Sequence, residues 1–138
     1  MDIPIMLALV TLITGGISRF CTKVAGENQV YSPSYMIVSS LCLCLIGVVI
    51  HFVHRQPFEL PAKMAGIAAI GGTVGGIGFY TMLLALRFGG EGSIIFPIAG
   101  LGLLVAVPLS FIVFKEPITG TKLLGLGLSV SSIIVLSR

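Results

Sequence analysis

Apolar residues dominate the chain in five long runs, and polar residues collect in the short stretches between them. Each run is close to the roughly 20 residues that a helix needs to cross the core of a bilayer. A helix is the expected form, because backbone groups in lipid must be bonded within their own segment. The pattern predicts an all-α integral membrane protein of five transmembrane helices, at about 3–22, 35–53, 64–86, 94–114 and 119–136.

The fourth run is uncharged from end to end and contains two prolines, Pro97 and Pro108. Within a membrane, neighbouring helices and small residues can satisfy the carbonyls that each proline leaves unbonded. We therefore expect one spanning helix with bends at both prolines. The sequence Lys115-Glu116-Pro117 then ends it.

Composition excludes most other classes of protein. The chain is 56% hydrophobic and 9% charged, against about 25% charged in ordinary soluble domains. The net charge of +3 is spread along the sequence, so there is no basic patch for nucleic acid. The cysteines and histidines show no metal-ligand spacing, and no nucleophile–base pair or phosphate loop occurs. We expect no enzyme activity, cofactor or metal.

The distribution of lysine and arginine between the two sets of loops does not indicate a membrane orientation. The loops on the side of the N-terminus carry Arg55, Lys63, Lys115 and Lys122, and those on the other side carry Arg19, Lys23, Arg87 and Arg138. Orientation normally follows an excess of such residues on the cytoplasmic side. The tie leaves two interpretations open. The chain inserts both ways and pairs antiparallel, or a weak bias or a partner fixes one orientation.

Small and polar residues recur at helical spacing in several runs. The stripes are Thr11, Gly15, Ser18 and Thr22; Thr73, Gly76, Tyr80 and Arg87; and Ser93, Pro97 and Gly100. Such residues serve close helix packing, or they line a cavity. Three stripes together favour a common cavity. In the last run Gly125, Ser129 and Ser132 form a small-residue ridge suited to a subunit contact.

Two arginines are candidate cations of that cavity. Arg19 is predicted in the exit turn of the first run, where it reaches the headgroups or faces the cavity. Arg87 has the same alternatives, with Glu91 as a partner one turn later. All five acidic residues lie in loops or at helix ends, which favours an anionic or zwitterionic solute. The candidate substrate-binding residues are Ser18, Arg19, Thr73, Tyr80, Arg87, Ser93 and Pro97.

The chain from the third run onward resembles a known family of membrane proteins. The ordered motifs are Phe79-Tyr80, Ala85-Leu86-Arg87, Ser93 with Phe96-Pro97, Val107-Pro108, Phe114-Lys115-Glu116-Pro117 and Gly125. Together they look like one EamA-like repeat of the drug/metabolite transporter superfamily. The first 60 residues match loosely, through Gly15-Gly16 and Lys23.

The resemblance implies an architecture and an activity. Members commonly have ten helices, built as two inverted five-helix repeats around a cavity lined by helices one to four of each repeat. This chain looks like one repeat, residues 1–138. A working transporter then needs a homodimer, antiparallel or not, or a heterodimer with a second repeat. The implied protein is multi-pass in the cell (inner) membrane and contacts the lipid bilayer and a small-molecule or lipid-linked substrate.

Other functions stay open within this resemblance. One is a subunit of a flippase for a lipid or lipid-linked sugar, and another is a non-transporting subunit of a larger membrane complex. The small multidrug resistance proteins are related, but their essential glutamate in the first span has no counterpart among residues 11–18. Proton-coupled export of cations is therefore not expected.

Overall fold

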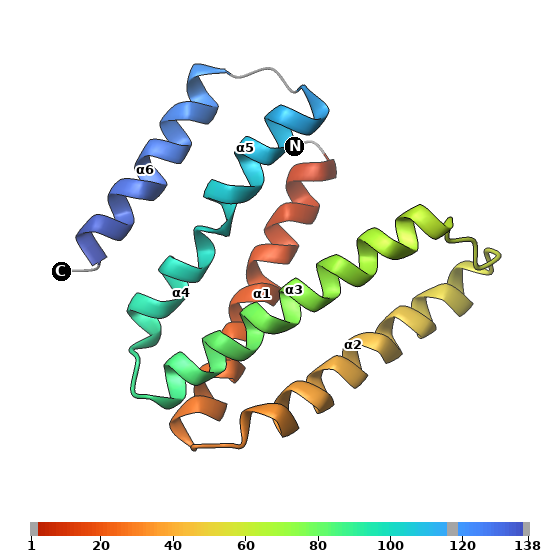
Figure 1. The fold of residues 1–138 in the computed structure, drawn as a ribbon, viewed down its shortest axis with the longest axis horizontal. Helices are drawn as coiled ribbons and strands as arrows, with labels where there is room; N and C mark the ends of the chain where they lie inside the picture. Colours follow the sequence, from red (N-terminus) through yellow and green to blue (C-terminus); the bar gives the residue numbers. More distant parts are fainter. Residues whose placement is uncertain (1–2, 116–118, 137–138) are drawn as a thin grey trace. The chain divides into compact units, whose positions relative to one another are not determined.

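The computed structural model describes residues 3–115 and 119–136, and its regular elements over these residues are helices. They are α1 (Ile3–Glu27), α2 (Ser32–His54), α3 (Ala62–Arg87), α4 (Gly92–Gly100), α5 (Gly102–Phe114) and α6 (Gly120–Leu136) (Figure 1). The predicted all-α class is confirmed. Asp2, Glu116, Pro117 and Arg138 fall outside the described residues, as does the side chain of Lys122.

Four segments are long and apolar enough to cross a membrane. They are α1, α2, α3 and the stretch Gly92–Phe114, which α4 and α5 share. These segments coincide with the first four predicted spans. The fifth predicted span coincides with α6, whose 17 residues contain the shorter apolar stretch Leu123–Ser132. That α6 also crosses the bilayer stays a prediction.

Helix α1 is longer than the sequence predicted. We expected it to end near residue 22, with a connection over 23–34, and this is wrong because the helix continues to Glu27. Its last turns stay helical because Thr22, Ala25 and Gly26 are buried, and Lys23 Nζ lies 3.8 Å from Glu27 Oε1 across one turn. Arg19 therefore lies about 12 Å before the end of the helix, and not in its exit turn.

The fourth span is interrupted at Leu101, and not at a proline. Pro97 lies inside α4 and Pro108 inside α5, so the expected single helix is divided at another residue, and the bends expected at the two prolines stay a prediction. The Leu101 N–H donates to the Ile98 carbonyl at 3.0 Å, and the Leu104 N–H to the Leu101 carbonyl at 2.7 Å. Both are the short bonds of a tight turn. Glycines at 100 and 102 flank it, and glycine has low helix propensity.

The chain divides into two compact units, Met1–Gly89 and Gly90–Arg138. In the first unit α3 packs against both α1 and α2, and in the second α4 packs against α6. Among the side chains that the structure describes, the buried apolar ones are Ala25, Leu83 and Leu86, all near the ends of α1 and α3. Many large apolar side chains along the rest of these helices are exposed, among them Leu7, Leu12 and Ile67, as is typical of helices whose faces meet lipid or other helices.

Candidate functional site

The closest approach in the first unit joins the last turns of α1 and α3. A Cβ atom added to Gly26 would lie 2.7 Å from the Leu86 Cβ and 3.3 Å from the Leu86 carbonyl carbon. Real Cβ atoms essentially never come as close as 2.7 Å. Because the atoms that it would meet belong to the main chain and to a Cβ, rotation of a side chain cannot relieve the overlap. Glycine at position 26 is what allows the two backbones to touch.

Two hydrogen bonds reinforce this contact. The Gln29 Nε2 donates to the Arg87 carbonyl at 2.9 Å, and the Arg87 Nε donates to the Gln29 Oε1 at 3.4 Å. The Gln29 amide thereby satisfies one of the last carbonyls of α3, which have no partner within their own helix. Gln29 itself has φ of 53°, in the left-handed region that non-glycine residues seldom adopt.

Two polar residues are buried at this place. Thr22 is 1% exposed, and its hydroxyl donates to the Ser18 carbonyl at 2.9 Å. Ser32, 2% exposed, begins α2 directly after the connecting turn. We call the contact of Gly26 and Gln29 with Leu86 and Arg87 the α1–α3 junction.

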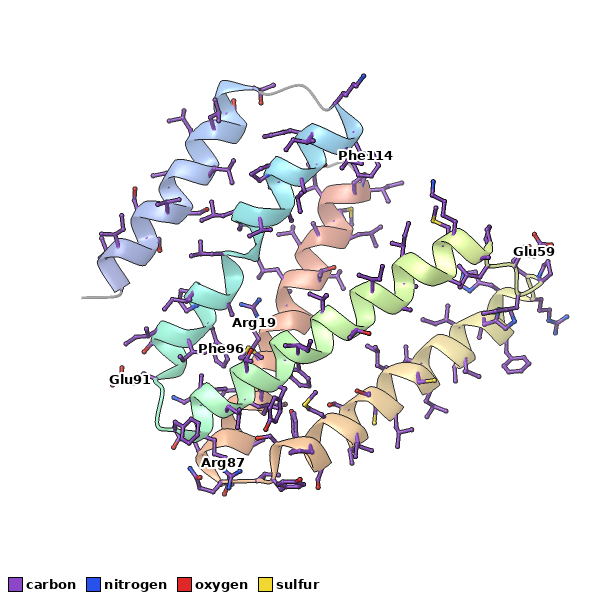
Figure 2. The ribbon with its side chains drawn as sticks, in the orientation of Figure 1. Arg19, Glu59, Arg87, Glu91, Phe96 and Phe114 are labelled. Atoms are coloured by element: carbon purple, nitrogen blue, oxygen red, sulfur yellow. The ribbon has the colours of Figure 1, made fainter. Side chains whose placement is uncertain are left out.

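The predicted stripe on α1 divides between the junction and an open surface. Thr22 belongs to the junction, whereas Thr11, Gly15 and Arg19, together with Leu12 and Gly16, line a hollow of about 500 Å³. Ser18 is exposed and contributes its carbonyl to Thr22. Figure 2 labels Arg19 well before the end of α1. Arg19 is thus the predicted site residue of α1 that lines a hollow.

The predicted stripe on α3 is also divided. The Thr73 hydroxyl donates to the Ala69 carbonyl at 2.8 Å and is exposed, and Tyr80 is 39% exposed. Arg87, labelled at the end of α3 in Figure 2, belongs to the junction through Gln29. Helical periodicity could not predict this partner, because the two residues are 58 positions apart in the chain.

In the second unit, the residues predicted on the fourth span meet α6. Pro97, Gly100 and Leu101 line a groove of about 400 Å³ with Leu128, Ser129 and Ser132. A second groove of about 520 Å³ shares Leu103 and Ser129 with the first, and its lining includes Ser110, Phe111 and Gly125. Ser93 lies at the start of α4, where its hydroxyl is 3.3 Å from Glu91 Oε2.

These grooves show which residues of the same chain lie beside the ridge on α6. Gly125, Ser129 and Ser132 line hollows shared with α4 and α5 of the same chain, so the ridge does not present itself only to another subunit. The subunit contact predicted for this ridge stays a prediction. A helical period shows which residues lie together, and packing decides what they meet.

The described residues include no group of three or more His, Cys, Asp or Glu side chains placed to hold a metal ion. Cys21, Cys42 and Cys44 are exposed free thiols. His51 lies with its ring centroid 5.8 Å from that of Phe58, and the His54 ring is 2.9 Å from the Ile50 carbonyl. Both histidines thus have neighbours that are not metal ligands.

Comparison with known proteins agrees with the resemblance seen in the motifs. The model of the EamA-like transporter family matches residues 2–138. The "Uncharacterized protein MJ1333.1" of Methanocaldococcus jannaschii is 28% identical over 138 residues, which cover 99% of this chain and 98% of that protein. No solved structure matches the chain. The chain therefore belongs to the EamA-like transporter family, a family of multi-pass membrane transporters.

Proposed function

We propose that this chain is one half of a transporter that moves a small metabolite or amphipathic solute, anionic or zwitterionic, by alternating access as a dimer. The observation that carries the proposal is the family match over residues 2–138, which contain one repeat of helices. The relative from Methanocaldococcus jannaschii is matched over nearly its whole length and is therefore of similar size. The membrane we propose is the cell (inner) membrane.

The exposed polar surface supports a two-chain cavity. Transporters built from repeats bind their substrate at the repeat interface, near the middle of the bilayer. In this chain Thr11, Arg19, Thr73 and Tyr80 lie on exposed parts of α1 and α3. A second copy, in antiparallel or parallel orientation, or a different second repeat would supply the opposite wall.

The distribution of charge supports an anionic or zwitterionic substrate. Arg19 lines a hollow about 12 Å before the end of α1. The described acidic side chains lie nearer the ends of helices or in loops, where Glu27 pairs with Lys23 and Glu91 meets Ser93. An arginine at membrane depth is costly, roughly 2.5–3.5 kcal/mol on insertion scales, and usually marks a pathway. Ser18, Tyr80, Ser93 and Pro97 remain candidate lining residues in this proposal.

Uptake into liposomes tests the proposal, with a panel of radiolabelled organic phosphates, carboxylates and zwitterions as solutes. Replacing Arg19 by Ala should lower uptake of an anionic solute about tenfold or more, since a charge-assisted bond contributes about 1.5–3 kcal/mol. Arg19→Lys should retain part of it, and Arg55→Ala, in the loop after α2, should change little. Full uptake by Arg19→Ala would remove Arg19 from the site.

Arg87 needs a separate control because of its place in the junction. We expect Arg87→Ala to lower uptake, and Gln29→Ala removes the same hydrogen bonds without removing the charge. Equal losses in the two variants would assign Arg87 to the junction. A larger loss in Arg87→Ala would assign its charge to the substrate.

Two further measurements separate the alternatives. Adding lipid-linked phosphates to the panel distinguishes a flippase from a transporter of soluble solutes. A flippase would move the lipid-linked phosphates and not the soluble solutes. Crosslinking in native membranes distinguishes a transporter dimer, which gives self-crosslinks, from a non-transporting subunit, which crosslinks only to other proteins. Labelling of cysteines placed at both ends of the chain shows whether it inserts in two orientations.

A further inference from the structure

The α1–α3 junction differs from every other part of these two helices. At Gly26 an added Cβ would meet the main chain of Leu86, whereas at Gly15 and Gly16 of α1 it would meet nothing within 4 Å. The same holds at Gly71, Gly72, Gly75, Gly76 and Gly78 of α3. The glycines toward the middle of both helices therefore leave space where Gly26 leaves none. Among these glycines of the two helices, Gly26 is the one that lies against the backbone of the other helix.

The helices separate from that end. In Figure 1, α1 and α3 come together beside the turns that follow them, and their first turns lie far apart. Burial follows the same gradient, because Thr22, Ala25, Leu83 and Leu86 are buried and Thr11 and Thr73 are exposed. Both helices run in the same direction from their separated starts to the junction.

The junction also sets the level of the candidate site residues. Gly26 lies against Leu86. Arg19 is seven residues before Gly26, and Tyr80 is six residues before Leu86. At 1.5 Å per residue both lie about 10 Å from the contact, so they stand at nearly the same height on the two helices. A slip of one helix along the other would separate them.

We propose that Gly26 and Gln29 are positioning residues, which hold α1 to α3 at a fixed junction about which the walls that carry Arg19 and Tyr80 open and close. This inference rests on the proposed alternating-access function. The competing possibility is a gate, whose contact breaks in each transport cycle. Main-chain contact at Gly26 and reciprocal hydrogen bonds at Gln29 favour a permanent joint, because a gate would lose all of these contacts at every opening.

Spin-label distances test the inference without any substrate. The full chain, with Cys21, Cys42 and Cys44 replaced by serine, receives labels in pairs and is studied by electron paramagnetic resonance in phosphatidylethanolamine–phosphatidylglycerol vesicles. The near pair is Val24→Cys with Phe88→Cys. The far pair is Leu7→Cys with Ile67→Cys, each 19 residues before the contact in its own helix. All four side chains are exposed.

The fixed joint predicts one narrow distance population for the near pair and a broader or double population for the far pair. Gly26→Ala should add a second, longer population to the near pair, because its Cβ cannot be accommodated at 2.7 Å. Gly15→Ala, the matched control on the same helix, should leave the near pair unchanged. Two populations for the near pair in the parent protein would indicate a gate and overturn the inference, as would equal behaviour of the two glycine variants.

A second variant covers the case in which Gly26→Ala does not fold. Gln29→Ala removes both hydrogen bonds and adds no atoms, and it should broaden the near-pair distribution while the helix content stays unchanged. An unchanged distribution in Gln29→Ala would overturn the role of Gln29. Because no transport is measured, a failure to move any solute would count against the proposed function and leave the distances valid.

Discussion

The two units of this chain use small residues in opposite ways. In the first, Gly26 brings the backbones of α1 and α3 into contact, and hardly any space remains beside Leu86. In the second, Gly125 and Ser129 of α6 border a groove of about 520 Å³, and a Cβ at Gly125 would meet nothing within 4 Å. A small residue closes two helices only where the backbones can approach, and elsewhere the same residue leaves a hollow.

The largest expected effect comes from filling these two places with the same side chain. Gly26→Leu should destabilise the protein by about 3 kcal/mol or more, because overpacking a closed contact displaces backbone. Gly125→Leu should cost less than about 1.5 kcal/mol, since the groove beside it has room for apolar atoms. Unfolding in detergent, followed by circular dichroism, measures both. Similar losses for the two variants would contradict the distinction between closed and open contacts.

A smaller effect is expected from the hydrogen bonds of the junction. Gln29→Ala should cost about 1–3 kcal/mol, because it removes two hydrogen bonds to Arg87 that each contribute about 0.5–1.5 kcal/mol. Asn28→Ala is the matched control, since its amide bonds the Val24 carbonyl at 2.7 Å within its own turn and joins no second helix. We expect the thermal midpoint to fall further in Gln29→Ala. A larger fall in Asn28→Ala would show that the turn, and not the junction, carries the stability.

The smallest expected changes in stability come from replacing two glycines, one in a turn and one at the start of a helix. Gly89 has φ of 88°, so Gly89→Ala should cost about 1–2 kcal/mol for the left-handed conformation. Gly102 opens α5 with no atom near its Cβ position, and Gly102→Ala should be neutral or stabilising by up to about 1 kcal/mol. Thermal midpoints that shift in opposite directions would confirm this. A loss in Gly102→Ala would mean that the interruption at Leu101 needs glycine beside it.

Much of the fold could be read from the pattern of the chain. In a bilayer, the backbone N–H and C=O groups of a long uncharged run find no water to bond. The helix satisfies these groups within the segment itself, without a second strand. The positions of the first four spans and the faces of the stripes follow from that constraint, and the motifs from Phe79 to Gly125 were enough to indicate the family. The pattern also singled out Arg19, whose role in a site stays a prediction, but it did not predict the position of Arg19 about 12 Å before the end of α1.

The tertiary structure alone decided which surfaces meet. The extension of α1 to Glu27 depends on burial of Thr22, Ala25 and Gly26 against another helix, which outweighs the charges at Lys23 and Glu27. The bonds between Gln29 and Arg87 and the direction of the α6 ridge depend on contacts between distant parts of the chain. Local pattern determines where helices form and which residues share a face. It does not determine which neighbour that face will have, because this is settled by the packing of all the helices together.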